Sequence, residues 1–107
     1  MRQQFLQDWH ELDAAGNPHG GVTTAPGLTI VWQRGPLGRG VDRKDPNGAF
    51  VETVIAAAAS RLEFYQASKF AGDENAAALE HLLGALFYLN KRTSLREARE
   101  VEGTHTV

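Results

Sequence analysis

The sequence predicts an α+β protein in which short N-terminal β-strands precede a long antiparallel helical hairpin, and it predicts an oligomer. Two observations support the fold: residues 28–32 are β-branched and aromatic, and apolar residues recur at three and four positions along 49–70 and 74–99. We expect residues 1–26 to form an N-terminal extension with room for a short helix and a linker. Residues 27–107 are expected to form a single strand-plus-hairpin domain.

The size and composition of the chain favour association with copies of itself. A chain of 107 residues buries only about 60 to 70 per cent of its unfolded surface. It contains no cysteine, which excludes disulfides and thiolate metal sites as sources of stability. The formal net charge of -2 argues against general binding to nucleic acid or to a membrane surface. No apolar run reaches the roughly 18 residues of a membrane span, and we expect a cytoplasmic protein.

The N-terminal region has a helical pattern followed by a segment rich in turn residues. Phe5, Leu6, Trp9 and Leu12 are spaced by one, three and three positions, which predicts a short amphipathic helix over residues 1–15 that docks on the main body or on a partner chain. Residues 14–27 carry four glycines and two prolines and are interpreted as a linker without regular structure.

The middle of the chain predicts one short strand and a long loop. The segment Leu28-Thr29-Ile30-Val31-Trp32 is flanked by glycines and predicts a strand. Residues 33–48 are rich in glycine and proline and include the turn pair Asn47-Gly48, so most of this segment is expected to be loop. A second short strand fits around residues 37–42 at most.

The second half of the chain predicts two helices joined by a tight turn. Gly72 is expected to end the first helix and Asp73 to cap the second. Two long helices with so short a connection form an antiparallel hairpin. Each helix also carries large apolar residues off its main stripe, which implies a helical oligomer interface. These residues are Phe64, Phe70, Phe87 and Tyr88.

Familiar catalytic and nucleotide motifs are absent from the sequence. The glycine loop at residues 35–40 has the order G-x-x-G-x-G and matches neither the phosphate-loop nor the dinucleotide fingerprint. Arg34, Arg39 and Arg43 are able to bind phosphate from this loop, although a solvated turn is the favoured interpretation. The four histidines show no metal-ligand spacing, and no serine lies in a nucleophile motif. We therefore predict no catalytic residue, no metal and no cofactor.

A basic cluster closes the second helix. Arg92, Arg96 and Arg99 fall on one helical face, next to Lys91. Cations at a helix C-terminus oppose the macrodipole, and nearby glutamates are able to pair with them. Two arginines one turn apart are also able to offer bidentate donors to phosphate. The spacing alone leaves both interpretations open.

Several short motifs together resemble a known family. They are Trp32-Gln33-x-Gly35-Pro36, Asn47-Gly48, Arg61-Leu62-Glu63-Phe64-Tyr65-Gln66, Glu74-Asn75-Ala76, Leu89-Asn90-Lys91-Arg92-Thr93 and the closing Arg96-Glu97-Ala98-Arg99-x-Val101-Glu102-Gly103-Thr104-His105. From about residue 28 to residue 106, the chain resembles phage proteins that share a helical hairpin with the Thoeris anti-defence protein one and the anti-CBASS protein two. The strand-bearing front half makes the Thoeris type the closer match.

The resemblance implies a sponge, namely a homohexamer of three dimers that binds bacterial immune signals in the cytoplasm of the infected host and leaves them intact. The implied ligands are cyclic ADP-ribose isomers and cyclic di- or trinucleotides, without a membrane or a nucleic-acid polymer as partner. By matching position, the ADP-ribose pocket contains Asn75 and Tyr65, with Phe64 beside it, and the trinucleotide pocket contains Arg92 and Arg96. Further ligand-binding candidates are Arg99, Thr104, His105 and Arg39.

The chain departs from the pattern usual in this family at Gly72, Asp73, residues 80–86 and Glu100. Asp73 stands where many relatives have arginine beside the hairpin turn, which bears on the choice of ligand in the first pocket. Glu100 stands where a glycine is usual, and we expect it to lengthen the last helix by a turn.

Three other functions stay open at this point. The basic face also suits a small nucleic-acid-binding helical-hairpin oligomer, whose affinity would fall log-linearly with salt. An enzyme that hydrolyses the signal would release a linear product. A structural phage oligomer would bind no small molecule at all.

Overall fold

The computed structural model describes residues 6–107, and it divides into two compact units. Residues up to Phe50 together with residues 101–107 form one unit, here called the sheet unit. Residues 51–100 form the other, here called the hairpin unit. Each unit is described by itself.

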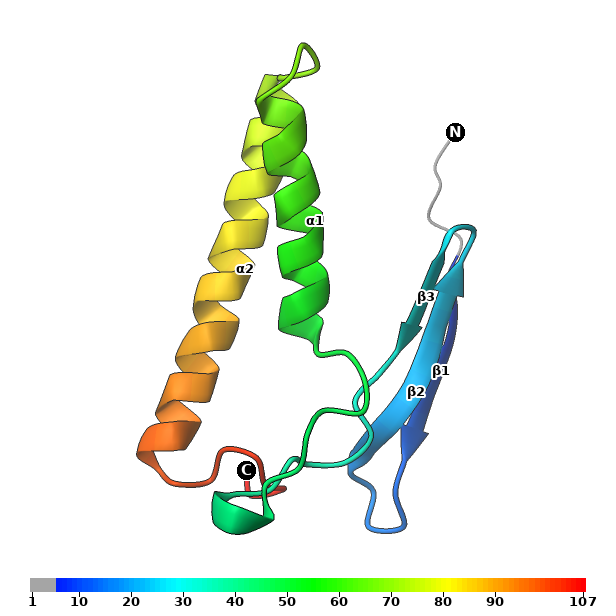
Figure 1. Cartoon of the computed structure of the whole chain (residues 1–107), viewed down its shortest axis with the longest axis vertical. Helices are drawn as coiled ribbons and strands as arrows, with labels where there is room; N and C mark the ends of the chain where they lie inside the picture. The colour runs from blue at the N-terminus through cyan, green and yellow to red at the C-terminus, as the bar shows by residue number, and fades with distance from the viewer. Residues whose placement is uncertain (1–5) are drawn as a thin grey trace. The chain divides into compact units, whose positions relative to one another are not determined.

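The sheet unit contains three antiparallel strands in the order β1-β2-β3 (Figure 1). They are β1 (Gln7–Leu12), β2 (Pro18–Ala25) and β3 (Leu28–Val31). Trp9 pairs with Val22, which pairs with Val31 on the other side, so these three residues share one face of the sheet. The strand predicted at residues 28–32 is confirmed as β3.

The predictions for the N-terminal region were wrong. Instead of a helix over residues 1–15, the described part of this segment forms β1, and instead of an unstructured linker, residues 14–27 contain β2. Phe5 lies outside the described residues. The apolar spacing suggested a helix, but the segment gains its hydrogen bonds from a neighbouring strand. Gly21 allows this pairing, because a Cβ at that position would overlap the carbonyl oxygen of Trp9.

The turn between β1 and β2 is organised by one carboxylate. Asp13 accepts hydrogen bonds from the backbone N–H groups of Ala15 and Asn17, both at 2.9 Å. This is an Asx-type turn, in which a side chain replaces a backbone acceptor. The bond from the Asn17 N–H holds the pKa of Asp13 below its ordinary value.

A hydrogen-bonded chain lies on the opposite face of the sheet. The indole Nε1–H of Trp32 donates to the Thr23 hydroxyl at 2.8 Å, and that hydroxyl donates to the Asp8 carboxylate at 2.8 Å. Thr23 is buried, so the two bonds satisfy a hydroxyl that lies away from water. The chain connects β1, β2 and the residue that follows β3.

The segment after β3 is loop, as expected, but the short strand predicted around residues 37–42 is wrong. It contains the 3₁₀-helix η1 (Gly40–Asp42). Gly38 and Gly40 have φ values of 84° and 64°, in the left-handed region that strands do not use. The chain turns back on itself here, and the Lys44 N–H donates to the Leu37 carbonyl at 2.7 Å.

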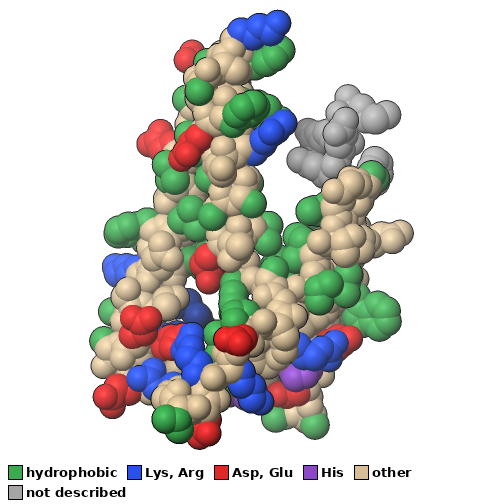
Figure 2. Space-filling model, viewed as in Figure 1, with side chains coloured by type: hydrophobic (Ala, Val, Ile, Leu, Met, Phe, Trp, Pro, Cys, Tyr) green, Lys and Arg blue, Asp and Glu red, His purple; other side chains and the backbone are tan. Residues whose placement is uncertain are grey.

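The hairpin unit consists of α1 (Val51–Gln66) and α2 (Asp73–Ala98), which lie side by side (Figure 1). Both predicted helices and the α+β class are therefore confirmed. Among the residues of the two helices, Ala59 is the one that falls in the buried class, with 4% exposure. Large apolar side chains stay exposed along the hairpin, and Figure 2 shows hydrophobic side chains on its surface. No helix within residues 6–107 is long and apolar enough to cross a membrane.

Three predictions about the helix ends were wrong. Gly72 does not end α1, which ends at Gln66. Asp73 does not cap α2: the N-cap is Gly72 in an extended conformation, without a side-chain cap hydrogen bond, and Asp73 is the first helical residue. The Gly72 N–H instead donates to the Gln66 side chain at 3.0 Å. Glu100 does not lengthen the helix, which ends at Ala98. Glu100 has a φ of 59°, the left-handed conformation that usually terminates a helix with glycine.

Replacing Glu100 with glycine is expected to stabilise the protein by about 1 kcal/mol, because a side chain in the left-handed region strains the backbone. Urea unfolding followed by circular dichroism measures the change. Glu100→Ala is the matched control, since it removes the charge but keeps the Cβ. Equal stability of the two variants would contradict the backbone explanation.

Candidate functional site

The first group of predicted site residues lies at the turn end of the hairpin. Phe64 and Tyr65 belong to the last turn of α1, and Asn75 belongs to the first turn of α2. Phe64 is 60% exposed, Tyr65 is half-buried, and their ring centroids are 6.0 Å apart with an interplanar angle of 52°. The rings thus form a partly exposed aromatic surface.

The turn between the helices is held by side-chain amides. Gln66 donates to the Gly72 carbonyl at 3.1 Å and accepts from the Gly72 N–H. The Asn75 side-chain amide donates to the Phe70 carbonyl at 3.3 Å. Asn75 therefore shapes the turn, and its side-chain oxygen stays available as an acceptor because no hydrogen bond to it occurs within residues 6–107.

Arg61 joins this group and was missed as a site residue in the sequence. Its guanidinium carbon lies 4.9 Å from the ring centroid of Phe64 and 5.0 Å from that of Tyr65. Its Nε–H donates to the Tyr65 hydroxyl at 3.2 Å. A cation over an exposed ring contributes about 0.5 to 1 kcal/mol. The spacing i, i+3, i+4 was the signal in the sequence, since it places the three side chains on one helical face.

The second group lies at the other end of α2. Arg92 and Arg96 are in its last turns and Arg99 is its C-cap, so the three share one face, as their spacing predicts. Arg92 is exposed and forms no ion pair with any other residue in the described range 6–107. Asn75 and Arg92 are separated by about 25 Å along the helix axis, at 1.5 Å per residue. The hairpin therefore has two separate candidate sites.

The remaining candidates, Arg39, Thr104 and His105, belong to the sheet unit. The Arg39 guanidinium donates to the Glu102 carbonyl at 3.2 Å, and Arg43 forms an ion pair with the Glu102 carboxylate at 2.7 Å. The Gly38 N–H donates to the Gly103 carbonyl at 2.7 Å. We call this set of contacts between residues 38–43 and 102–103 the tail clasp.

The closing Glu-Gly-Thr-His string takes part in the tail clasp. Residues 101–104 are half-buried, and the Thr104 hydroxyl donates to the Val101 carbonyl. His105 is exposed, and its charge is among the minor contributions that lower the pKa of Asp13. Arg34, the third loop arginine, pairs with Glu11 at 2.8 Å. All three loop arginines thus contact the sheet unit's own residues.

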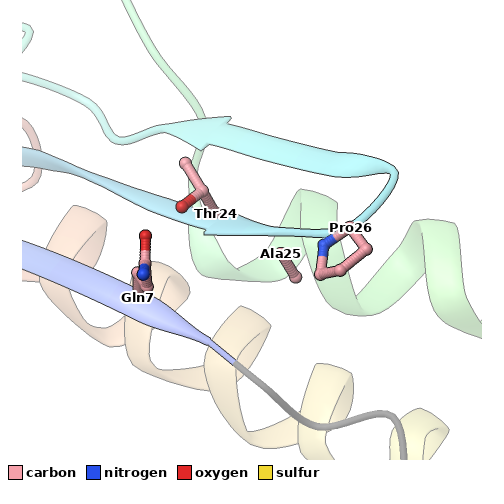
Figure 3. Close-up of a pocket in the computed structure, with 4 residues that line it drawn as sticks. All are labelled: Gln7, Thr24, Ala25 and Pro26. Carbon is pink, nitrogen blue, oxygen red and sulfur yellow. The ribbon is translucent and has the colours of Figure 1, made fainter.

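A pocket of about 320 Å³ lies elsewhere in the sheet unit. Figure 3 shows its lining residues Gln7, Thr24, Ala25 and Pro26, with Gln7 and Thr24 on neighbouring strands. None of the ligand-binding residues predicted from the sequence lines it. Within residues 6–107, no group of three or more histidine or acidic side chains is placed to hold a metal ion.

Comparison with known proteins gives two results. The family described as Acb2/Tad1, hairpin domain, matches residues 26–94. A protein of Bacillus phage SBSphiJ7 named Thoeris anti-defense 1 is 46% identical over 77 residues, which cover 72% of this chain and 51% of that protein. The matched region thus spans about half the length of this curated relative.

Proposed function

Because this chain belongs to the Acb2/Tad1 hairpin family and resembles its Thoeris anti-defence 1 members, we propose that it is a phage anti-defence protein that sequesters cyclic nucleotide immune signals. The proposed ligands are cyclic ADP-ribose isomers and cyclic di- or trinucleotides. The protein binds them without cleavage in the cytoplasm of the infected bacterium.

The observation that carries this proposal is the arginine face of α2. Arg92, Arg96 and Arg99 follow one another at four- and three-residue spacing on one face, a spacing that suits the phosphates of a cyclic oligonucleotide. The C-terminal end of a helix disfavours anions, so the side chains themselves must provide the attraction. We assign the trinucleotide site to this face.

The ADP-ribose site is proposed at the turn end of the hairpin. The exposed ring of Phe64 and the half-buried ring of Tyr65 offer a surface on which adenine stacks, and Asn75 offers an acceptor for a ribose hydroxyl or the adenine amino group. Asp73 is in the same first turn of α2 as Asn75, and its charge opposes a closely bound phosphate. We expect this acid to restrict which isomers bind.

The proposed assembly is a homohexamer built as three dimers. The exposed apolar side chains of the hairpin support self-association, because such a surface is unfavourable in water. Phe87 and Tyr88 form an edge-to-face pair and are 61% and 67% exposed. The tail clasp holds Arg39 against Glu102, and the role of Arg39, Thr104 and His105 as ligand contacts stays a prediction.

Isothermal titration against a cyclic ADP-ribose isomer and against cyclic tri-adenylate, with the mass in solution measured in parallel, tests the proposal. We expect tight binding of at least one ligand, and chromatography after heat denaturation of the protein is expected to recover it unchanged. Recovery of a linear product would identify an enzyme instead. No heat with either ligand would contradict sequestration of these signals.

The same arginine face also favours a nucleic-acid-binding hairpin. That alternative predicts similar affinity for any DNA or RNA and a steep log-linear loss of affinity with salt. A sponge is expected to prefer the cyclic ligand over a linear oligoadenylate at every salt concentration. Equal binding of the two would favour the alternative.

Asn75→Ala is expected to weaken binding of the cyclic ADP-ribose isomer by about tenfold to 100-fold, because a polar contact to the ligand is lost. Titration calorimetry measures this, and the affinity for cyclic tri-adenylate is expected to stay unchanged. Gln66→Ala is the matched control, since it loosens the same turn without removing a proposed ligand contact. An equal loss in both variants would show that Asn75 acts only through the turn.

A further inference from the structure

Arg61, Phe64 and Tyr65 form one continuous, partly exposed surface on α1, here called the Arg61 cluster. The guanidinium lies over both rings, at 4.9 Å and 5.0 Å from their centroids, and its Nε–H is bonded to the Tyr65 hydroxyl. One side chain thus spans two rings and is anchored at one of its nitrogen atoms.

The positions on α1 that neighbour Arg61 carry no acid. The helical positions three and four residues before it are Ala58 and Ala57, and those after it are the two aromatic residues, so no carboxylate occupies a neighbouring position on this face. Within residues 6–107, Arg61 forms no ion pair. A guanidinium carries five N–H donors, and the one on Nε is used by Tyr65. The donors on its two Nη atoms are oriented by the anchor and remain for a ligand.

The small side chains beside Arg61 leave space for a ligand to approach. Ala57 and Ala58 are both exposed, as is Arg61 itself. A nucleotide requires a flat apolar surface for its base and a cation within a few ångströms for its phosphate. The Arg61 cluster provides both, with the ring of Tyr65 and the guanidinium in direct contact.

We propose that Arg61 is a ligand-binding residue that binds the diphosphate of an adenine dinucleotide-like ligand through its Nη groups while the base stacks on the neighbouring rings. This inference rests on the proposed function, because it extends the ADP-ribose site by a residue. The bond from Nε–H to the Tyr65 hydroxyl fixes the guanidinium plane, so the cation is positioned before the ligand arrives.

Titration of the full-length protein with a cyclic ADP-ribose isomer tests this residue. Arg61→Ala is expected to weaken binding at least about tenfold, because a charge-assisted contact to phosphate is lost. Arg61→Lys is expected to give an intermediate affinity, since lysine keeps the charge but lacks the planar fork and the Nε–H. The dependence of affinity on salt is expected to be shallower for Arg61→Ala than for the natural protein.

Two controls separate a ligand contact from a loss of structure. Lys69→Ala removes another exposed cation that lies over a ring, 5.3 Å from the centroid of Phe70, and is expected to leave the affinity unchanged. Binding of cyclic tri-adenylate to Arg61→Ala is expected to match that of the natural protein, since that ligand is assigned to the arginine face of α2.

The outcomes distinguish this inference from the proposed function. Unchanged ADP-ribose affinity in Arg61→Ala would overturn the inference and leave the sponge intact. An affinity loss with unchanged salt dependence, or with a parallel loss of cyclic tri-adenylate binding, would assign Arg61 a structural role and also overturn it. If the natural protein binds cyclic tri-adenylate but not the cyclic ADP-ribose isomer, the inference about Arg61 is overturned and the proposed sequestration stands. If it binds neither ligand, the proposed function is contradicted, and the inference about Arg61 is overturned with it.

Discussion

Arg92→Ala and Arg96→Ala are each expected to weaken binding of cyclic tri-adenylate by about 100-fold, equivalent to about 2.7 kcal/mol. The reason is that a guanidinium fork that binds a phosphate oxygen through two N–H groups is replaced by a methyl group, and the phosphate loses its countercharge. Titration calorimetry at fixed salt measures the change, and the mass in solution is expected to stay that of the natural protein.

Lys91→Ala is the matched control for these two variants. Lys91 is an exposed cation in the same turn of α2, but it points about 100° away from Arg92 around the helix. Its removal changes the net charge equally, and we expect less than about a threefold effect because no direct phosphate contact is lost. Equal losses of affinity in Lys91→Ala and Arg92→Ala would indicate a general electrostatic attraction and contradict a specific arginine site.

Gly21→Ala is expected to destabilise the sheet unit by about 3 kcal/mol or more. Its φ of 126° is unfavourable for any residue with a Cβ, and the added methyl group would overlap the Trp9 carbonyl oxygen across the β1–β2 pair. Relief of the overlap requires β1 to move away, which breaks inter-strand hydrogen bonds. A loss of this size is a large fraction of the stability of a small protein.

Tryptophan fluorescence during urea unfolding measures this effect, because both tryptophans of the chain, Trp9 and Trp32, belong to the sheet unit. Gly27→Ala is the matched control. Its φ of 79° is also left-handed, but a Cβ there meets no atom within 4 Å, so we expect a cost of about 1 to 2 kcal/mol. Equal midpoints for the two variants would contradict the close strand approach at Gly21.

The candidate site was only partly predictable from the sequence. Helical spacing placed Arg92, Arg96 and Arg99 on one face, and the structure agrees because that geometry depends only on the local repeat of the helix. Resemblance to a family suggested Tyr65 and Asn75. The same helical spacing would also have placed Arg61 in the candidate site, since Arg61 stands three and four positions before the two aromatic residues.

The tail clasp could not be predicted from local sequence patterns. Arg39 and Glu102 are 63 positions apart, and no pattern in either segment identifies the other as its partner. Gly103 permits the contact, because a Cβ there would overlap the Gly38 carbonyl oxygen, but a glycine in a sequence has many other uses.

The amino-acid sequence was sufficient for α1, α2 and β3, since helices form hydrogen bonds within one segment and β3 has a strongly β-branched composition bounded by glycine. The tertiary structure was needed for β1, β2 and the tail clasp. A strand such as β1 (Gln7–Leu12) satisfies its backbone only through another strand, so its state depends on β2 and on the close approach at Gly21. Such contacts join residues that are distant along the chain, so the local spacing of residues does not predict them.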